Sequence, residues 1–120
     1  MSESASKKQK TTATQFEQLA ACTTIVADTG KIDQIKKFQP TDATTNPSLI
    51  LQAANLPEYA ELVKNAALYG KTNGGEDIND QLSLAIDNVC VAFGTEISKV
   101  IPGYVSTEVD ARLSFDVEQS

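Results

Sequence analysis

The strongest pattern in the chain is a long run of apolar residues at helical spacing. Apolar side chains recur at steps of three and four residues, at Ile78, Leu82, Ala85, Ile86, Val89, Phe93, Ile97 and Val100. Residues at this spacing lie on one face of an α-helix, so the run predicts a helix of about six turns with one apolar stripe.

Shorter apolar patterns predict further helices before this one. A helix of residues 32–38 is expected to stop before Pro40, because a proline disfavours helical backbone in the residue that precedes it. Residues 47–54 predict a second helix, which opens on a proline that suits the first helical turn. Pro57 begins a third, and Gly70 is its expected end.

Three short segments between the helices have strand character. Residues 23–27 are a compact β-branched run, and residues 42–47 are Thr-rich and too polar to be identified as a strand by hydrophobicity alone. Residues 105–110 alternate, with Val105, Thr107 and Val109 on one face and Ser106, Glu108 and Asp110 on the other. Strands that alternate with helices predict right-handed crossovers and a parallel sheet, and the fold class is therefore α/β.

All three predicted strands end in polar groups. The first ends at Asp28, the second at Thr44 and Asn46, and the third at Glu108 and Asp110. In parallel α/β proteins the site lies at the carboxyl ends of the strands. Two carboxylates and an amide that converge there would suit proton transfer at a carbonyl or hydroxyl carbon.

These residues also have purely structural interpretations. An aspartate before Thr-Gly is a common turn residue, and spacing alone favours this interpretation for Asp28. For Asn46, a helix cap before a proline is as well supported as a functional role. Glu108 would lie on a solvated strand face if the strand were exposed, although a parallel sheet weakens this interpretation. Asp110 and Arg112 can pair with each other or with neighbours at the rim.

Composition narrows the functional classes. The chain has 120 residues, so it is one domain at most, and its net charge of −6 argues against a nucleic-acid partner. The absence of histidine excludes Ser-His and Cys-His pairs and imidazole metal ligands within these residues. Cys22 and Cys90 lack metal-ligand spacing, and no run is long enough to span a membrane. Free thiols, a cytoplasmic location and no membrane partner are expected.

The N-terminal residues lack periodicity. Residues 1–14 are rich in Ser, Thr and Lys and are predicted to form a disordered arm before a single segment, residues 15–120. The basic cluster at residues 7–10 is short and solitary, so a solvating tail is favoured over a nuclear-targeting patch.

Three segments resemble those of one enzyme family. Residues 42–50 (DATTNPSLI) look like the N-terminal signature of transaldolases, and residues 105–116 (VSTEVDARLSFD) resemble the third-strand segment of that family. Residues 26–30 (VADTG) are similar to its first strand. The segments occur in the family's order and at suitable spacing.

The resemblance implies the N-terminal part of a (β/α)8 (TIM) barrel, with about three parallel strands and crossover helices. It implies transfer of a dihydroxyacetone unit between sugar phosphates in the pentose phosphate pathway, from sedoheptulose 7-phosphate to glyceraldehyde 3-phosphate. The family's reaction uses a lysine Schiff base and no metal or other cofactor. A complete chain of this kind is compatible with a homodimer.

The resemblance also implies roles for individual residues. Asp28 would be the catalytic acid and base that handles the hydroxyl proton during carbon–carbon cleavage. Glu108 would be catalytic as well, activating water and moving protons while the imine forms and hydrolyses. Asn46 would hydrogen-bond the dihydroxyacetone unit, and Thr44 and Ser106 would line the substrate pocket.

The sequence departs from the family pattern in length and at two positions. A complete barrel needs roughly 200–250 residues, and the Schiff-base lysine belongs to a fourth strand that would follow Ser120. Tyr104 stands where the family usually has arginine, and Lys31 where an acidic residue is usual. The lysines after residue 30 are predicted to lie on helices or loops rather than at strand ends. These 120 residues alone are therefore expected to be inactive.

An alternative interpretation is a truncated, non-catalytic paralogue that acts as a binding or interaction module. The downstream coding sequence distinguishes the two, because only the first requires a further lysine-bearing strand. In either case, three strands of a barrel leave sheet edges unpaired. The segment is therefore predicted to be marginally stable, to aggregate, or to need a complementing fragment.

Overall fold

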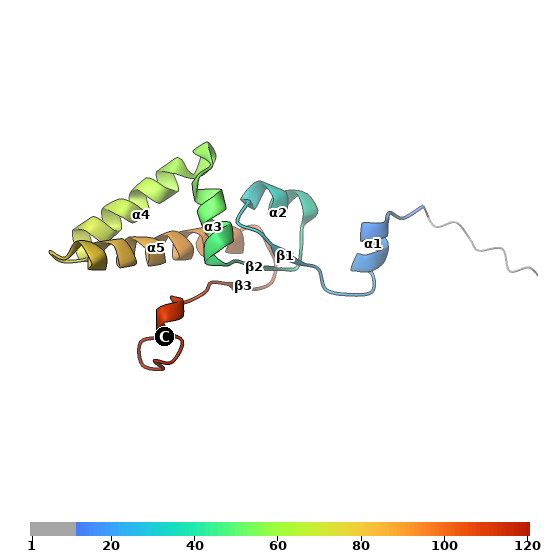
Figure 1. Ribbon diagram of the computed structural model, residues 1–120. Helices are drawn as coiled ribbons and strands as arrows, with labels where there is room; N and C mark the ends of the chain where they lie inside the picture. Colours follow the sequence, from blue (N-terminus) through green and yellow to red (C-terminus); the bar gives the residue numbers. More distant parts are fainter. Residues whose placement is uncertain (1–11) are drawn as a thin grey trace, which may run out of the picture.

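The computed structural model of the protein describes residues 12–120, and residues 1–11, with the basic cluster, lie outside the described residues. Thr14 caps the first helix through a capping box with Glu17. The elements are α1 (Gln15–Ala20), β1 (Val26–Asp28), α2 (Ile32–Phe38), β2 (Asp42–Thr44), α3 (Pro47–Ala54), the 3-10 helix η1 (Pro57–Tyr59), α4 (Ala60–Asn73), α5 (Ile78–Ser98), β3 (Val105–Ser106) and the 3-10 helix η2 (Ala111–Leu113) (Figure 1). This order confirms the predicted alternation of strands and helices.

The three strands form a parallel sheet in the order β1-β2-β3, so β2 is central and β1 and β3 are edge strands. Ala27, Ala43 and Val105 align across the sheet. All three belong to the hydrophobic core or pack against it, which identifies the face of the sheet that the helices cover. Successive side chains of a strand point to opposite faces, so the next row of residues faces away from these helices.

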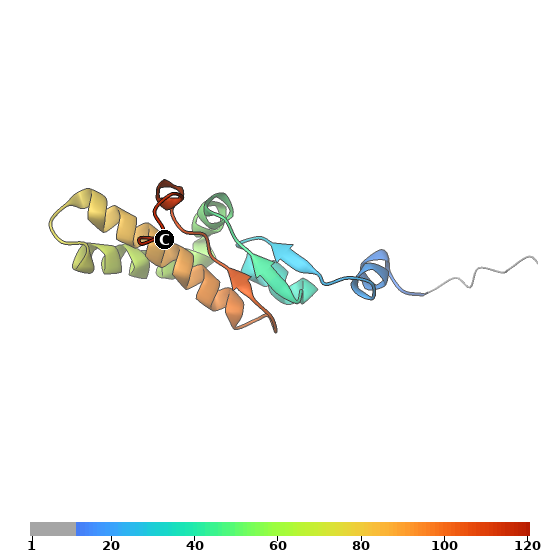
Figure 2. The same ribbon diagram turned by 90° about the horizontal axis from the view of Figure 1, so that it is seen from below.

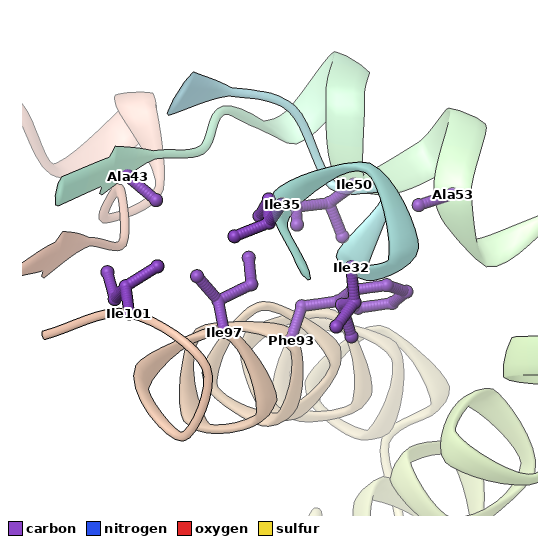
Figure 3. Close-up of a cluster of buried hydrophobic side chains, with 8 residues drawn as sticks. All are labelled: Ile32, Ile35, Ala43, Ile50, Ala53, Phe93, Ile97 and Ile101. Atoms are coloured by element: carbon purple, nitrogen blue, oxygen red, sulfur yellow. The ribbon is translucent and has the colours of Figure 1, made fainter. Parts of the chain in front are cut away.

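The core lies between the sheet and helices α2, α3 and α5. Its buried members are Ile32, Ile35, Ala43, Ile50, Ala53, Phe93, Ile97 and Ile101. Figure 3 shows Phe93 and Ile97 extending from α5 toward Ile32 and Ile35 of α2. The C-terminal half of the predicted apolar stripe on α5 is therefore buried, as expected.

Helices α4 and α5 form a hairpin that projects beyond the sheet (Figures 1 and 2). The expected end of α4 at Gly70 is wrong, because the helix continues to Asn73. Gly70 is buried against α5, and a Cβ there would lie 2.6 Å from the Cβ of Ala85. Gly70 therefore serves close helix packing and not termination. Within residues 12–120, no helix has the length and apolar character needed to cross a bilayer.

Strand β3 is shorter than predicted, ending at Ser106 rather than continuing to Asp110. After Ser106 the chain packs along α5. A Cβ on Gly94 would lie 2.6 Å from the hydroxyl oxygen of Thr107, so the missing side chain leaves the room that Thr107 occupies. Residues 107–110 therefore alternate in sequence without continuing the sheet.

The turn that leads into β3 requires glycine at position 103. The Gly103 amide donates to the Thr41 carbonyl oxygen at 2.9 Å, and the Tyr104 amide donates to the Asp42 carboxylate at 2.8 Å. A Cβ on Gly103 would lie 2.6 Å from the Thr41 carbonyl oxygen and would overlap the Asp42 carboxylate. The turn from α5 to β3 therefore brings the backbone at Gly103 so close to Thr41 and Asp42 that no side chain fits there.

Gly103→Ala is expected to lower the free energy of unfolding by about 1–3 kcal/mol, because the backbone must shift to accommodate the methyl group. Urea unfolding followed by circular dichroism would measure the loss. Pro102→Ala, at an exposed neighbour in the same turn, is the control and should cost less. Equal losses for the two variants would contradict this explanation.

Candidate active site

A row of polar side chains lies on the face of the sheet opposite the core. Asp28, Thr44 and Ser106 align with one another across β1, β2 and β3. The Thr44 hydroxyl donates to Asp28 Oδ1 at 3.0 Å, which orients one carboxylate oxygen. All three residues are the last of their strands. They therefore lie at the carboxyl end of the sheet, where the sequence predicted a site.

The end of β3 is held by a residue that the sequence analysis did not single out. Thr45 is 3% exposed, and its hydroxyl donates to the Ser106 carbonyl oxygen at 2.9 Å. This bond ties the end of β3 to the segment that follows β2. The polar run in residues 42–46 was the only signal for it, because hydrophobic periodicity does not reveal which threonine in such a run is buried.

Asn46 is the N-cap residue of helix α3. Its side-chain oxygen accepts from the Leu49 amide at 3.0 Å, and Pro47 occupies the first helical turn. The capping interpretation is therefore confirmed. Capping uses the amide oxygen, so the half-buried side chain retains its NH₂ group as a donor for a ligand.

Glu108 does not share a strand with Ser106, so the predicted common face is wrong. It is exposed and lies two residues beyond the end of β3. With Asp87 and Cys90 of α5 it lines a cavity of about 230 Å³. Burial raises the pKa of the Cys90 thiol, and the Asp87 and Glu108 carboxylates raise that pKa further. The structure thus joins Asp28, Thr44 and Ser106 in one row and leaves Glu108 beside α5.

Asp110 and Arg112 pair with each other, as one of the sequence interpretations proposed. The Arg112 backbone amide donates to Asp110 Oδ1 at 2.8 Å, and Arg112 Nε donates to Oδ2 at 2.9 Å. Hydrogen bonds from the Arg112 side chain and then from its backbone lower the pKa of Asp110 from 3.8 to about 2. Asp110 therefore remains an anion at any pH well above 2.

A carboxyl carbon titration by NMR is expected to give Asp110 a midpoint near pH 2, and Arg112→Leu should raise the midpoint toward 3.8. Because the folded-state pKa is depressed, the pair stabilises the fold above pH 3.8, and this contribution disappears as the pH falls through about 2. Lys64→Leu, which removes a cation that pairs with Glu61, is the control and should leave the midpoint unchanged.

The lysines of the described segment lie outside the strands. They are all exposed, on helices or at helix ends, at Lys31, Lys36, Lys37, Lys64, Lys71 and Lys99. Among residues 12–120, no three potential His, Cys, Asp or Glu ligands gather to hold a metal ion. A cavity of about 650 Å³ lies between α2, η1, α4 and α5 on the helical side and not at the polar row.

Comparison with known proteins identifies relatives along most of the chain. The family model for transaldolase/fructose-6-phosphate aldolase matches residues 25–120. The transaldolase of Saccharomyces cerevisiae is 56% identical over 119 residues, covering 98% of this chain and 35% of that protein. The transaldolase of Shewanella baltica OS185 is 57% identical over 108 residues, covering 90% of this chain and 34% of that protein. The transaldolase of Kluyveromyces lactis is 57% identical over 117 residues, covering 97% and 34%.

The matches to these relatives account for a sheet of only three strands. The chain spans about a third of the length of the curated relatives it matches. Three parallel strands with helices on one face are consistent with part of the TIM barrel that the family implies. The match covers most of the sequence and includes all three strands. The chain belongs to the transaldolase/fructose-6-phosphate aldolase family.

Proposed function

We propose that the chain supplies the first three strands of a transaldolase barrel and, with them, part of its active site. In this role it would act in the cytoplasm on sugar phosphates, transferring a dihydroxyacetone unit from sedoheptulose 7-phosphate to glyceraldehyde 3-phosphate. The observation that carries the proposal is the row of Asp28, Thr44 and Ser106 on the face away from the core. In a TIM barrel the strand face opposite the helices points into the barrel, and the active site lies at the carboxyl ends of the strands.

Asp28 has the chemistry and the setting of an acid–base group. Its carboxylate can take the hydroxyl proton of the substrate during carbon–carbon cleavage and return it in the reverse direction. The hydrogen bond from Thr44 holds one oxygen at 3.0 Å and leaves the other for the substrate. Ser106, one strand further along the same row, would contact the bound sugar.

Asn46 and Glu108 complete the proposed set. The NH₂ group of Asn46 would donate to the dihydroxyacetone unit, since the oxygen of the same amide is used in the helix cap. Glu108 would activate water during imine formation and hydrolysis. That role requires the segment after Ser106 to direct this carboxylate toward the row, which is the arrangement expected once a fourth strand pairs with β3.

The covalent step lies outside these residues. A Schiff base forms when a neutral lysine amine attacks the substrate ketone and water leaves, and its lysine must sit where the amine can be deprotonated. The described lysines are exposed and belong to no strand. We therefore expect the 120-residue chain alone to form no imine.

The test replaces the matching segment of Saccharomyces cerevisiae transaldolase with this chain and measures transaldolase activity of the chimera. We expect an active chimera, and a chain that by itself gives no adduct when borohydride is added with fructose 6-phosphate. A folded but inactive chimera would overturn the proposed function. A stable adduct on the isolated chain would overturn the expectation of inactivity. Unmodified yeast transaldolase is the positive control for both assays.

A further inference from the structure

Thr44, Thr45 and Asn46 each make a side-chain hydrogen bond to a different element. The Thr44 hydroxyl donates to Asp28 at the end of β1, at 3.0 Å. The Thr45 hydroxyl donates to the Ser106 carbonyl oxygen at the end of β3, at 2.9 Å. The Asn46 side-chain oxygen accepts from a backbone amide in the first turn of α3, at 3.0 Å. These three side chains therefore connect β1, β3 and α3 to the segment that ends the central strand.

Thr45 is the buried member of this segment. Thr44 and Asn46 are half-buried, and within the described part of the chain Thr45 is the only buried residue with a polar side chain. A buried hydroxyl costs free energy unless it is hydrogen-bonded, and the bond to the Ser106 carbonyl oxygen meets that requirement. Burial keeps Thr45 out of contact with a bound substrate, so any effect on the reaction must pass through another residue.

The Thr45 bond lies one residue beyond the last aligned pair of the sheet. Thr44 and Ser106 are the last residues that align between β2 and β3. The hydroxyl therefore extends the connection between these strands past their ends. The carbonyl that it holds belongs to the rigid peptide unit between Ser106 and Thr107, so the bond restricts the direction in which the chain leaves β3. Glu108 is the next residue along that chain.

We propose that Thr45 is a positioning residue for the reaction, whose hydroxyl holds the ends of β2 and β3 together. It thereby sets Ser106 and Glu108 in relation to Asn46, which is its own neighbour in the chain. The inference rests on the proposed function, in which these three residues contact the substrate or act on it. A misplacement of about 1 Å in such an arrangement can lower a rate by about 100-fold, because the reacting groups lose their alignment.

The test compares Thr45→Val with Thr45→Ser in the chimera with Saccharomyces cerevisiae transaldolase. Valine has nearly the shape of threonine but no hydroxyl, whereas serine keeps the hydroxyl and loses the methyl group. We expect Thr45→Val to lower kcat by about 10- to 100-fold and to change KM for fructose 6-phosphate by less than about threefold, because Thr45 does not contact the substrate. Thr45→Ser should keep kcat within about threefold of the parent chimera, because it can still donate the hydrogen bond.

The order of the two variants separates positioning from packing. If Thr45 only filled buried space, valine would preserve the packing and serine would leave a small cavity, so Thr45→Ser would be the more damaging change. A kcat per folded molecule that is lower for Thr45→Ser than for Thr45→Val would therefore overturn the proposal.

Hydrogen–deuterium exchange of the chimera, followed by mass spectrometry, gives a second measurement that does not depend on activity. We expect residues 105–110 to exchange faster in Thr45→Val than in the parent, because the end of β3 loses its attachment. Thr72→Val is the matched control, since the Thr72 hydroxyl also donates to a backbone carbonyl oxygen, that of Leu68 at 2.8 Å on α4. It should leave both exchange and kcat unchanged. Unaltered exchange of residues 105–110 in Thr45→Val would contradict the positioning role.

The positioning role and the proposed function fail in different ways. An active parent chimera in which Thr45→Val retains full kcat would reject the positioning role alone. A parent chimera that folds but is inactive would reject the proposed function, and the positioning role with it.

Discussion

Replacing Phe93 with alanine is expected to lower the free energy of unfolding by about 3–5 kcal/mol. Phe93 is completely buried at the centre of the core, and its ring packs edge-on against Tyr59 with ring centroids 5.1 Å apart. Alanine would remove the apolar contacts and leave a cavity among side chains that can collapse only in part. Since small domains are stable by only about 5–15 kcal/mol, this single change should bring the chain close to global unfolding.

Urea unfolding followed by circular dichroism would measure this loss, in the chimera if the chain alone does not unfold reversibly. Val91→Ala is the matched control, because Val91 lies two residues away on the same helix and is 57% exposed. Its cost should be within about 0.5 kcal/mol of zero apart from the small change in helix propensity. A loss below about 1 kcal/mol for Phe93→Ala would mean that α5 is not held by this core.

The two halves of α5 differ in burial, and this difference shows what a hydrophobic pattern can and cannot predict. The spacing of apolar residues predicted the helix and the burial of Phe93 and Ile97 correctly. It also grouped Ile78 and Leu82 with them, and these are exposed. Periodicity identifies side chains that share a face of a helix, because that depends only on the helical repeat. It does not identify what covers the face, which depends on tertiary structure and on the length of chain present.

The strands were harder to delimit than the helices. Each is only two or three residues long. Whether such a short segment is a strand or an extended loop depends on pairing with a neighbouring strand and not on its own residues. Residues 107–110 alternate as a strand does, yet Thr107 packs against Gly94 of α5. The central strand contains the buried Ala43 between two polar residues, so its hydrophobicity was a poor guide.

The candidate site was predicted in part for a physical reason. Topology alone places the ends of parallel strands at one edge, so Asp28 and Thr44 were expected near one another. Ser106 came only from the family resemblance, because the third strand was predicted to end at Glu108 and Asp110. The hydrogen bond between Thr44 and Asp28 depends on the register of β1 against β2, which no local pattern encodes. Glu108 was assigned to the same face by extending β3, and the early end of that strand removed the basis of the assignment.

Asp28→Asn in the yeast chimera is expected to lower kcat by about 10²–10⁴-fold, the range that general acid–base groups contribute. Asparagine keeps the size of the side chain and can still accept the hydrogen bond from Thr44, but it cannot take up and return a proton. Thr44→Val should lower kcat less, because it removes only the group that orients the carboxylate. Steady-state rates with fructose 6-phosphate and erythrose 4-phosphate would measure both effects.

The ranking of these two variants separates chemistry from stability. Asp33→Asn is the control, because Asp33 is an exposed carboxylate on α2 that pairs only loosely with Lys36 at 3.9 Å, and it should leave kcat unchanged. If Asp28 acts only as a turn residue, Asp28→Asn would reduce activity no more than Asp33→Asn does. If Thr44 matters only through folding, its variant would lower the unfolding midpoint and leave kcat per folded molecule intact. A proton-transfer role for Asp28 requires a large loss of kcat in a chimera that still folds, with Thr44→Val between it and the control.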